Sequence, residues 1–175
     1  MLNFPCGDDV IRWDSYNNEF VCNRFSIDEW HKMVCDIDTE DEWQSFLSDF
    51  SEFVKCYILK KNDTNEAIGF VYLYKESLSS KVVSIHGGIW DSRTSSLLAY
   101  RAIFVLIEHL FNEGMKVRTS CLIENKPASR FIRGIGFVKY YSSHTHTYMW
   151  INQKRLNSNP IYKRLKEGLL CAGEG

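Results

Sequence analysis

The chain has 175 residues, a formal net charge of -1, 45% hydrophobic residues and 25% charged residues. This length and composition predict a single folded domain spanning residues 1–175 and exclude a disordered chain. No apolar run reaches the roughly 20 residues of a membrane-spanning helix. The start, MLNFPCGDDV, also lacks the basic and apolar regions of a secretory signal. We therefore expect a cytoplasmic protein without membrane association.

Cysteine spacing and charge distribution give weaker signals. The six cysteines are scattered without a CxxC pair, so we expect reduced, packed thiols and no metal site. Acidic residues crowd residues 36–42, and basic residues crowd the last third of the chain. This asymmetry suits either an anionic cofactor and a cationic substrate at opposite ends, or two ordinary solvated faces. The basic residues are not interleaved with stacking aromatics, so no nucleic-acid partner is expected.

The first half of the chain predicts two helices and then a β-meander. A strand at 20–25 precedes a helix with Ser26 as N-cap and Glu29 completing a capping box. A second helix begins near Thr39. The β-rich segments that follow are separated by polar turns and predict strands at 56–60, 67–75 and 82–90.

The second half of the chain alternates between helix-like and strand-like sequence patterns. An apolar helix is expected at 95–112, closed by Gly114, followed by a strand at 116–123 and a short helix at 127–133. A hairpin at 137–141 and 145–151 and a basic helix at 160–170 complete the chain. This order predicts a mixed α/β domain with a largely antiparallel sheet and a crossover helix.

Two features near the long helix suggest a ligand. The turn DSRTSSLLA (91–99) opens the helix, whose unpaired N–H groups could bind phosphate, or its hydroxyl residues could simply cap the helix. The strand before it contains Gly87 and Gly88, which indicate either a bulge or a close approach of a ligand to the backbone.

The most specific motif is ENKPASRFIRGIGF (124–137). It resembles the fourth motif of the GCN5-related N-acetyltransferase (GNAT) superfamily, with Asn125, Ala128, Phe131, Gly136 and Phe137 at the motif positions. The apolar helix preceded by a polar turn and a Trp-ended strand is a second similarity. Within the superfamily, the chain is most similar to the bacterial enzymes that acetylate ribosomal proteins and small amines.

The resemblance implies a GNAT-like fold and acetyl-CoA as co-substrate. The expected architecture is a largely antiparallel central sheet of about six to seven strands with a splayed parallel pair and about four helices. The pantetheine arm would lie in the splay, and the pyrophosphate would lie at the start of the long helix. The cofactor-binding residues that this predicts are Ile89, Trp90, Thr94, Ser95, Ser96, Leu97, Leu98, Ala99, Asn125, Ala128 and Phe131.

The sequence departs from the GNAT pattern at two points. The glycines of the family's pyrophosphate loop are absent from TSSLLA (94–99), and Ile132 stands where many members have a tyrosine that acts as general acid. Ser129 is the residue that we predict as a replacement acid, with Tyr140 and Tyr141 as alternatives.

The general base is predicted to be His86, on the central strand. The other interpretation of His86 is a hydrogen-bonded core histidine. His144 and His146 alternate along the last hairpin, which favours a solvent face or a substrate wall over a metal pair. Glu76 and Asp91 flank the region.

The resulting hypothesis is an N-acetyltransferase. It would move an acetyl group from acetyl-CoA to a primary amine of a small molecule or of a protein N-terminus, by direct attack in a ternary complex. The alternative is a catalytically inactive GNAT-like fold that binds a ligand or another protein. No metal is expected, and the aromatic residues of the last hairpin would also suit a homodimer interface.

Overall fold

The structure is a computed structural model of the chain, and it describes residues 4–5, 11–16, 39, 41, 45, 54–89 and 96–172. The first two predicted elements, and nearly all of the second predicted helix, lie outside these residues. The named elements are β1 (Phe4–Pro5), β2 (Ile11–Tyr16), β3 (Val54–Lys61), β4 (Ala67–Tyr74), β5 (Val82–Ile89), α4 (Ser96–Asn112), β6 (Lys116–Leu122), α5 (Lys126–Ile135), β7 (Val138–Ser142), β8 (His146–Ile151), α6 (Gln153–Ser158) and α7 (Pro160–Ala172).

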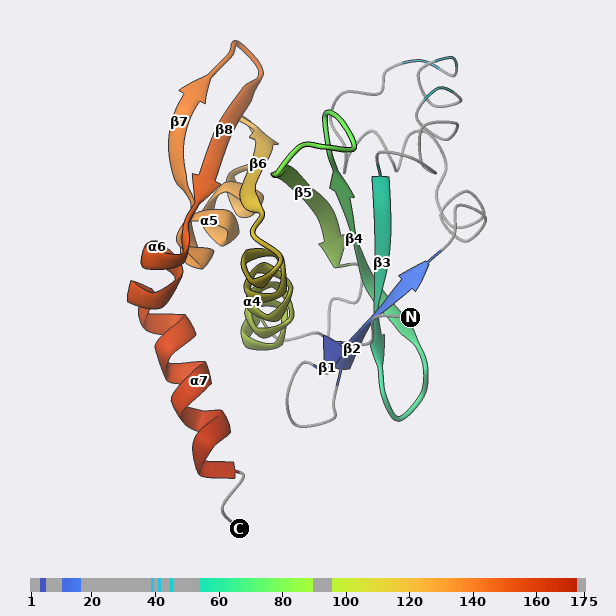
Figure 1. The fold of residues 1–175 in the computed structure, drawn as a ribbon, viewed down its shortest axis with the longest axis vertical. Coiled ribbons are helices and arrows are strands. Elements are labelled where there is room, and N and C mark those ends of the chain that lie inside the picture. The colour runs from blue at the N-terminus through green and yellow to red at the C-terminus, as the bar shows by residue number, and fades with distance from the viewer. Residues whose placement is uncertain are drawn as a thin grey trace.

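One sheet of eight strands organises these elements, in the order β1-β2-β3-β4-β5-β6-β8-β7 (Figure 1). Every neighbouring pair is antiparallel except β5 and β6, which are joined through the crossover helix α4. The predicted mixed α/β fold with a largely antiparallel sheet is therefore confirmed. The sequence did not predict β1 and β2, which extend the sheet beyond β3.

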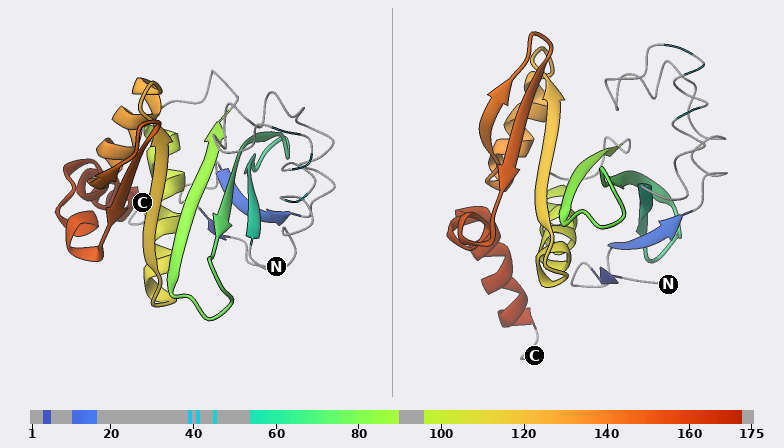
Figure 2. Two further views of the ribbon diagram at one scale, coloured as in Figure 1. Left: turned by 90° about the horizontal axis from the view of Figure 1, so that it is seen from above. Right: turned by 45° about the horizontal axis from the view of Figure 1, so that its top comes forward.

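The parallel pair is short and then splays. Its ladder contains Val82↔Lys116, Val83↔Val117 and Ser84↔Arg118. Both strands continue for several residues beyond this ladder, and Figure 2 (left) shows them diverging from their common start. The edge of β5 that faces β6 is thus released from strand pairing after Ser84.

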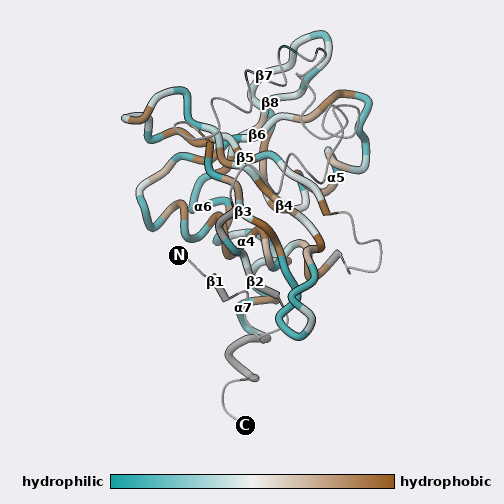
Figure 3. Tube along the Cα trace, turned by 90° about the vertical axis from the view of Figure 1, so that its right-hand side faces the viewer, coloured by the Kyte–Doolittle hydropathy of each residue, from teal (hydrophilic) through white to brown (hydrophobic). Residues whose placement is uncertain are grey.

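Helix α4 forms the core together with one face of the sheet. Its buried residues pack against inward-facing side chains of β3 to β6 and β8, and α7 contributes Tyr162. Trp13 of β2 is buried, and its Nε1 donates a hydrogen bond of 2.8 Å to the Ala102 carbonyl oxygen of α4. Figure 3 shows the hydrophobic residues concentrated in the strands and the hydrophilic ones in the turn after β3. Within the described ranges, no helix has the length and apolar character needed to cross a membrane.

The ends of α5 are fixed by side-chain and backbone caps. Asn125 Oδ1 accepts a hydrogen bond from Ala128 N at 3.0 Å, and Gly136 closes the helix with a left-handed φ of 108°. Asn159 links this end to α7, because its Nδ2 donates to Gly134 O at 2.7 Å and its Oδ1 accepts from Ile161 N at 2.8 Å. These bonds hold α5 against the rest of the core.

Gly87 is the glycine whose replacement tests the strand packing. A Cβ atom at this position would meet the Phe70 carbonyl oxygen and lie 2.8 Å from Val71 Cα of β4. We expect Gly87→Val to destabilise the fold by about 3 kcal/mol, although valine favours strands, because the neighbouring backbone cannot yield cheaply. Urea unfolding measures the change.

Gly114→Asn is the matched control for this substitution. Gly114 has a φ of +74° and no neighbouring atom within 4 Å of an added Cβ. Asparagine tolerates this conformation, so the cost should stay below about 1 kcal/mol. Equal costs at the two positions would contradict the close approach of β4 and β5.

Candidate functional site

A cavity of about 470 Å³ occupies the splay between β5 and β6. This volume lies within the range of small-molecule sites. Helices α4 and α5 close it on one side. Its lining is mainly apolar and consists of Val71, Ile85, His86, Gly87, Gly88, Ile89, Ala99, Ile103, Thr119, Ser120, Cys121, Asn125, Pro127, Ala128, Phe131, Ile132, Ile135 and Phe137.

The free edge of β5 supplies the backbone of the site. The ladder to β6 ends at Ser84, while pairing to β4 continues on the other edge as far as Ile89. Residues 86–89 all line the cavity, and two of them are glycines. Backbone N–H and C=O groups at such an edge can pair with an extended ligand that contains amides. The space that Gly87 leaves by lacking a side chain is filled by the backbone of β4.

His86 is half-buried at the edge of this cavity. It pairs in register with Tyr72 of β4, and the two rings stack with centroids 5.0 Å apart. The pKa of His86 is lowered to about 4, first by burial and then by the positive charge of Arg118 and the proximity of His146. The imidazole is therefore neutral at pH 7 and can accept a proton.

Two side-chain bonds hold the point where the strands separate. Arg118 Nε donates to Ser84 Oγ at 2.7 Å, and its Nη2 forms an ion pair with Glu76. One residue further along, Thr119 Oγ1 donates to the Ile85 carbonyl oxygen at 2.7 Å. The splay thus begins at a fixed position. Sequence reasoning did not single out Arg118 or Thr119, because their partners are known only from the register of β5 with β6.

Helix α5 borders the cavity with three of the predicted cofactor-binding residues. Asn125, Ala128 and Phe131 all line it. Asn125 also caps the helix, so its side-chain oxygen is engaged with Ala128 N. The Phe131 ring stacks on Tyr100 of α4 with centroids 4.7 Å apart, which joins the two helices at the wall of the cavity.

The predicted residues around the start of α4 have different positions. Ile89 and Ala99 line the cavity, whereas Leu97 is 52% exposed and Leu98 packs partly against the core. Three further predictions, Trp90, Thr94 and Ser95, lie outside the described residues. The first residue of α4 is Ser96, whose side chain is also outside the description. The pyrophosphate assignment of these residues therefore stays a prediction.

The predicted acid Ser129 lies on α5, near Cys121 of β6. Ser129 is not among the residues that line the cavity. Cys121 does line it, together with Ser120, and burial raises the pKa of the Cys121 thiol. Both residues were missed from the sequence, because their place at the splay follows from the end of the β5–β6 ladder at Arg118.

The two histidines of the last hairpin differ in their surroundings. His144 is exposed in the turn before β8, whereas His146 is buried and its Nδ1 lies 2.8 Å from Thr145 Oγ1. Among the described residues, no group of three or more His, Cys, Asp or Glu could hold a metal ion.

The comparisons with known proteins identify the fold. No family model matches the chain, and no curated protein matches its sequence. The chain is structurally similar to a GCN5-related N-acetyltransferase from Brucella melitensis, with a TM-score of 0.67 and 15% identity over 96% of this chain and 85% of that one. Other matches are N-acetyltransferases of ribosomal proteins.

Two further matches are proteins with a stated ligand or substrate. Apo FdhC, a nucleotide-linked sugar GNAT, matches with a TM-score of 0.66 and 16% identity over 94% of this chain and 98% of that one. Spermidine N-acetyltransferase from Vibrio cholerae, in complex with CoA and spermine, matches with a TM-score of 0.64 and 12% identity over 86% and 100%. The chain therefore has the GNAT fold that its sequence suggests.

The lowered pKa of His86 predicts a pH dependence of stability. Above pH 6.5, the ordinary pKa of histidine, His86 is neutral in both the folded and the unfolded protein. Between pH 6.5 and about pH 4, the unfolded chain binds a proton at His86 that the folded chain does not bind. Stability is therefore lost as the pH falls through this window. Between pH 7 and pH 4.5, the wild type should lose about 2 kcal/mol more than His86→Gln in urea unfolding. Parallel pH profiles for the two proteins would contradict this prediction.

The cap of α5 gives a second prediction. Asn125→Ala should cost about 1 kcal/mol, because the Ala128 N–H then loses its side-chain acceptor. Asn125→Asp should remain close to the wild type, because a carboxylate caps a helix equally well. Thermal unfolding of both variants measures this difference, and an equally stable alanine variant would show that the cap contributes nothing.

Proposed function

We propose that the protein is an acyl-CoA-dependent N-acetyltransferase that transfers the acetyl group of acetyl-CoA to a primary amine. The observation that carries this proposal is the free edge of β5 inside the cavity, with His86 at the same place. An extended chain with amide groups, such as pantetheine, is the kind of ligand that such an edge can pair with. The GNAT fold of the chain supports the same activity.

The donor would lie between β5 and α5. Its amides would pair with the backbone of residues 86–89, and Ala128 and Phe131 would form the opposite wall. Its phosphates would lie at the N-terminus of α4, where unpaired N–H groups and the helix dipole favour an anion. Ala99, one turn into that helix, already lines the cavity. Ser96, Leu97 and Leu98 belong to the same first turn.

The chain's own residues would assist the transfer in a ternary complex. The amine nitrogen attacks the thioester carbonyl, a C–N bond forms, and the C–S bond breaks. His86, neutral at pH 7, would take the proton that the amine loses, directly or through a water molecule. The departing thiolate takes a proton in turn. Ser129, which lies near Cys121 but does not line the cavity, stays a prediction for this proton donor.

The acceptor would approach on the face of the sheet away from α4. Along β5, Val83 and Ile85 point into the core with α4, so the intervening Ser84 and His86 point to the other face. Small amines and protein N-termini are the proposed acceptors, because the matched structures include acetyltransferases of spermidine and of ribosomal proteins.

The proposal predicts donor binding and a specific role for His86. Acetyl-CoA at a hundred times its Kd should stabilise the protein by about 2.7 kcal/mol in thermal unfolding. His86→Gln should keep that stabilisation while lowering kcat by about 100-fold or more, because only proton transfer is lost. Since the pKa of His86 is about 4, the loss of activity that comes from protonating His86 should appear only near pH 4, below the fall in kcat/KM that protonation of the acceptor amine itself produces.

The controls separate binding from catalysis. The control variant is His144→Gln, because His144 is an exposed histidine in the turn before β8. This variant should have the same kcat as the wild type. No stabilisation at millimolar acetyl-CoA would refute the proposed function. Donor binding without transfer to any amine would favour a binding module with this fold.

A further inference from the structure

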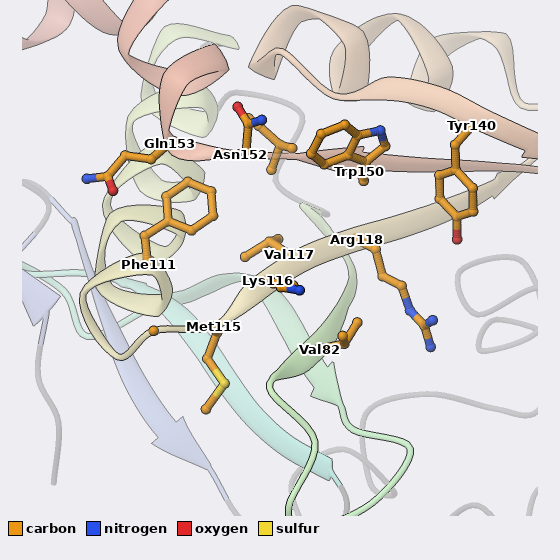
Figure 4. Close-up of a pocket in the computed structure, with 12 residues that line it drawn as sticks. Val82, Phe111, Met115, Lys116, Val117, Arg118, Tyr140, Trp150, Asn152 and Gln153 are labelled. Atoms are coloured by element: carbon orange, nitrogen blue, oxygen red, sulfur yellow. The ribbon is translucent and has the colours of Figure 1, made fainter.

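A second cavity of about 590 Å³ lies at the paired start of β5 and β6, at the opposite end of the ladder from the splay (Figure 4). The proposed donor site does not include it. Its twelve lining residues come from the start of β5 and β6, the end of α4, the last hairpin and the start of α6. They are Val82, Phe111, Gly114, Met115, Lys116, Val117, Arg118, Tyr140, Trp150, Ile151, Asn152 and Gln153.

The charged residues of this lining are both basic. They are Lys116 and Arg118, and none of the other ten residues is acidic. The guanidinium of Arg155 adds a third positive charge, 6.0 Å from the centroid of the Trp150 ring. Because the Arg118 guanidinium is already paired with Glu76, Lys116 and Arg155 supply the net positive charge that favours an anion over a cation such as a polyamine.

Exposed aromatic rings provide the second feature. Trp150 is 38% exposed and Tyr140 is 54% exposed, and Phe111 adds a third ring at the end of α4. In Figure 4, Trp150 of β8 and Tyr140 of β7 lie on the same side of the cavity as the Arg118 side chain of β6. Exposed rings beside cations are suited to stack a planar group whose attached phosphate or carboxylate meets the charges.

The strand register places four side chains of this lining on the same face as His86, namely Val82, Lys116, Arg118 and Trp150, whereas Phe111, Val117 and Ile151 lie on the core side. Lys116 is opposite Val82, Arg118 is opposite Ser84, and Trp150 is opposite Arg118. Side chains on alternate residues share a face, so His86 continues the row formed by Val82 and Ser84. The distance along β5 from Val82 to His86 is ~13 Å at the usual rise per residue.

We propose that this second cavity binds the far end of the acyl acceptor, and that this end is a planar anionic group such as a nucleoside diphosphate. The acceptor amine would then lie at His86, about 13 Å away along β5. The role of this cavity in binding the acceptor rests on the proposed function, whereas the binding of an anion in it does not. The acceptor class that follows is an amine joined to a nucleotide, in preference to a polyamine.

Calorimetry with uridine diphosphate tests the site directly. The titration is performed with the donor cleft saturated by CoA, because CoA itself contains a nucleotide and could share a site with the probe. We expect uridine diphosphate to bind under these conditions, and uridine, which lacks the phosphates, to bind at least about tenfold more weakly.

Matched variants locate the binding. Lys116→Gln and Tyr140→Ala should each raise the Kd by about tenfold, through the lost charge and the lost stacking. Tyr141→Ala is the control for Tyr140, since Tyr141 is 56% exposed on the same strand but lies outside the lining. Lys163→Gln, an exposed lysine of α7, is the control for Lys116. Both controls should bind like the wild type.

Three results would overturn the inference. These are no binding of uridine diphosphate, binding that CoA abolishes, and equal binding by all four variants.

A turnover assay then tests the acceptor role: a uridine diphosphate-linked amino sugar should have a higher kcat/KM than spermidine, and Lys116→Gln should remove that preference. A preference for spermidine would refute the acceptor class while leaving the acetyltransferase proposal intact. A failure to bind acetyl-CoA would refute the proposed function and the acceptor role together, leaving uridine diphosphate binding as evidence for the anion site alone.

Discussion

The short parallel ladder between β5 and β6 is the constraint on which the site depends. The ladder stops at Ser84↔Arg118, and the side chains of this pair are themselves hydrogen-bonded at 2.7 Å. Thr119 adds a bond to the Ile85 carbonyl at the first unpaired residue. With these bonds in place, the edge of β5 beyond Ser84 is released at a fixed point. A longer ladder would pair the backbone edge that the cleft exposes, and a shorter one would remove the hydrogen bonds that fix where the strands separate.

The arms of the splay are held apart by packing. Helix α4 lies against both strands, and Ile85 of one arm and Cys121 of the other belong to the same core. The wall formed by α5 is fixed by its own caps and by the Asn159 bonds to Gly134 and Ile161. The cavity therefore belongs to a rigid scaffold, which is the arrangement that positions a ligand accurately.

The sequence predicts local elements well and their partners poorly. The apolar periodicity of residues 96–112 and the Asn125 cap are local signals, and both elements are present. By contrast, β2 escaped prediction because IRWDSY has mixed polarity, and the burial of Trp13 against α4 follows from the tertiary structure. The roles of Arg118 and Ser84 follow from a register between residues that are 34 positions apart, which no local pattern contains.

His86 shows why the chemistry of the site needs the tertiary structure. Its pKa is lowered by burial, by Arg118 from β6 and by His146 from β8, while Tyr72 from β4 stacks on its ring. Each of these groups arrives from a different strand. Arg118 also lines the second cavity, so one guanidinium fixes the base of the splay, adds to the lowering of the His86 pKa and borders the neighbouring site. The donor cleft, which His86 lines, and the second cavity thus share an electrostatic neighbour in Arg118.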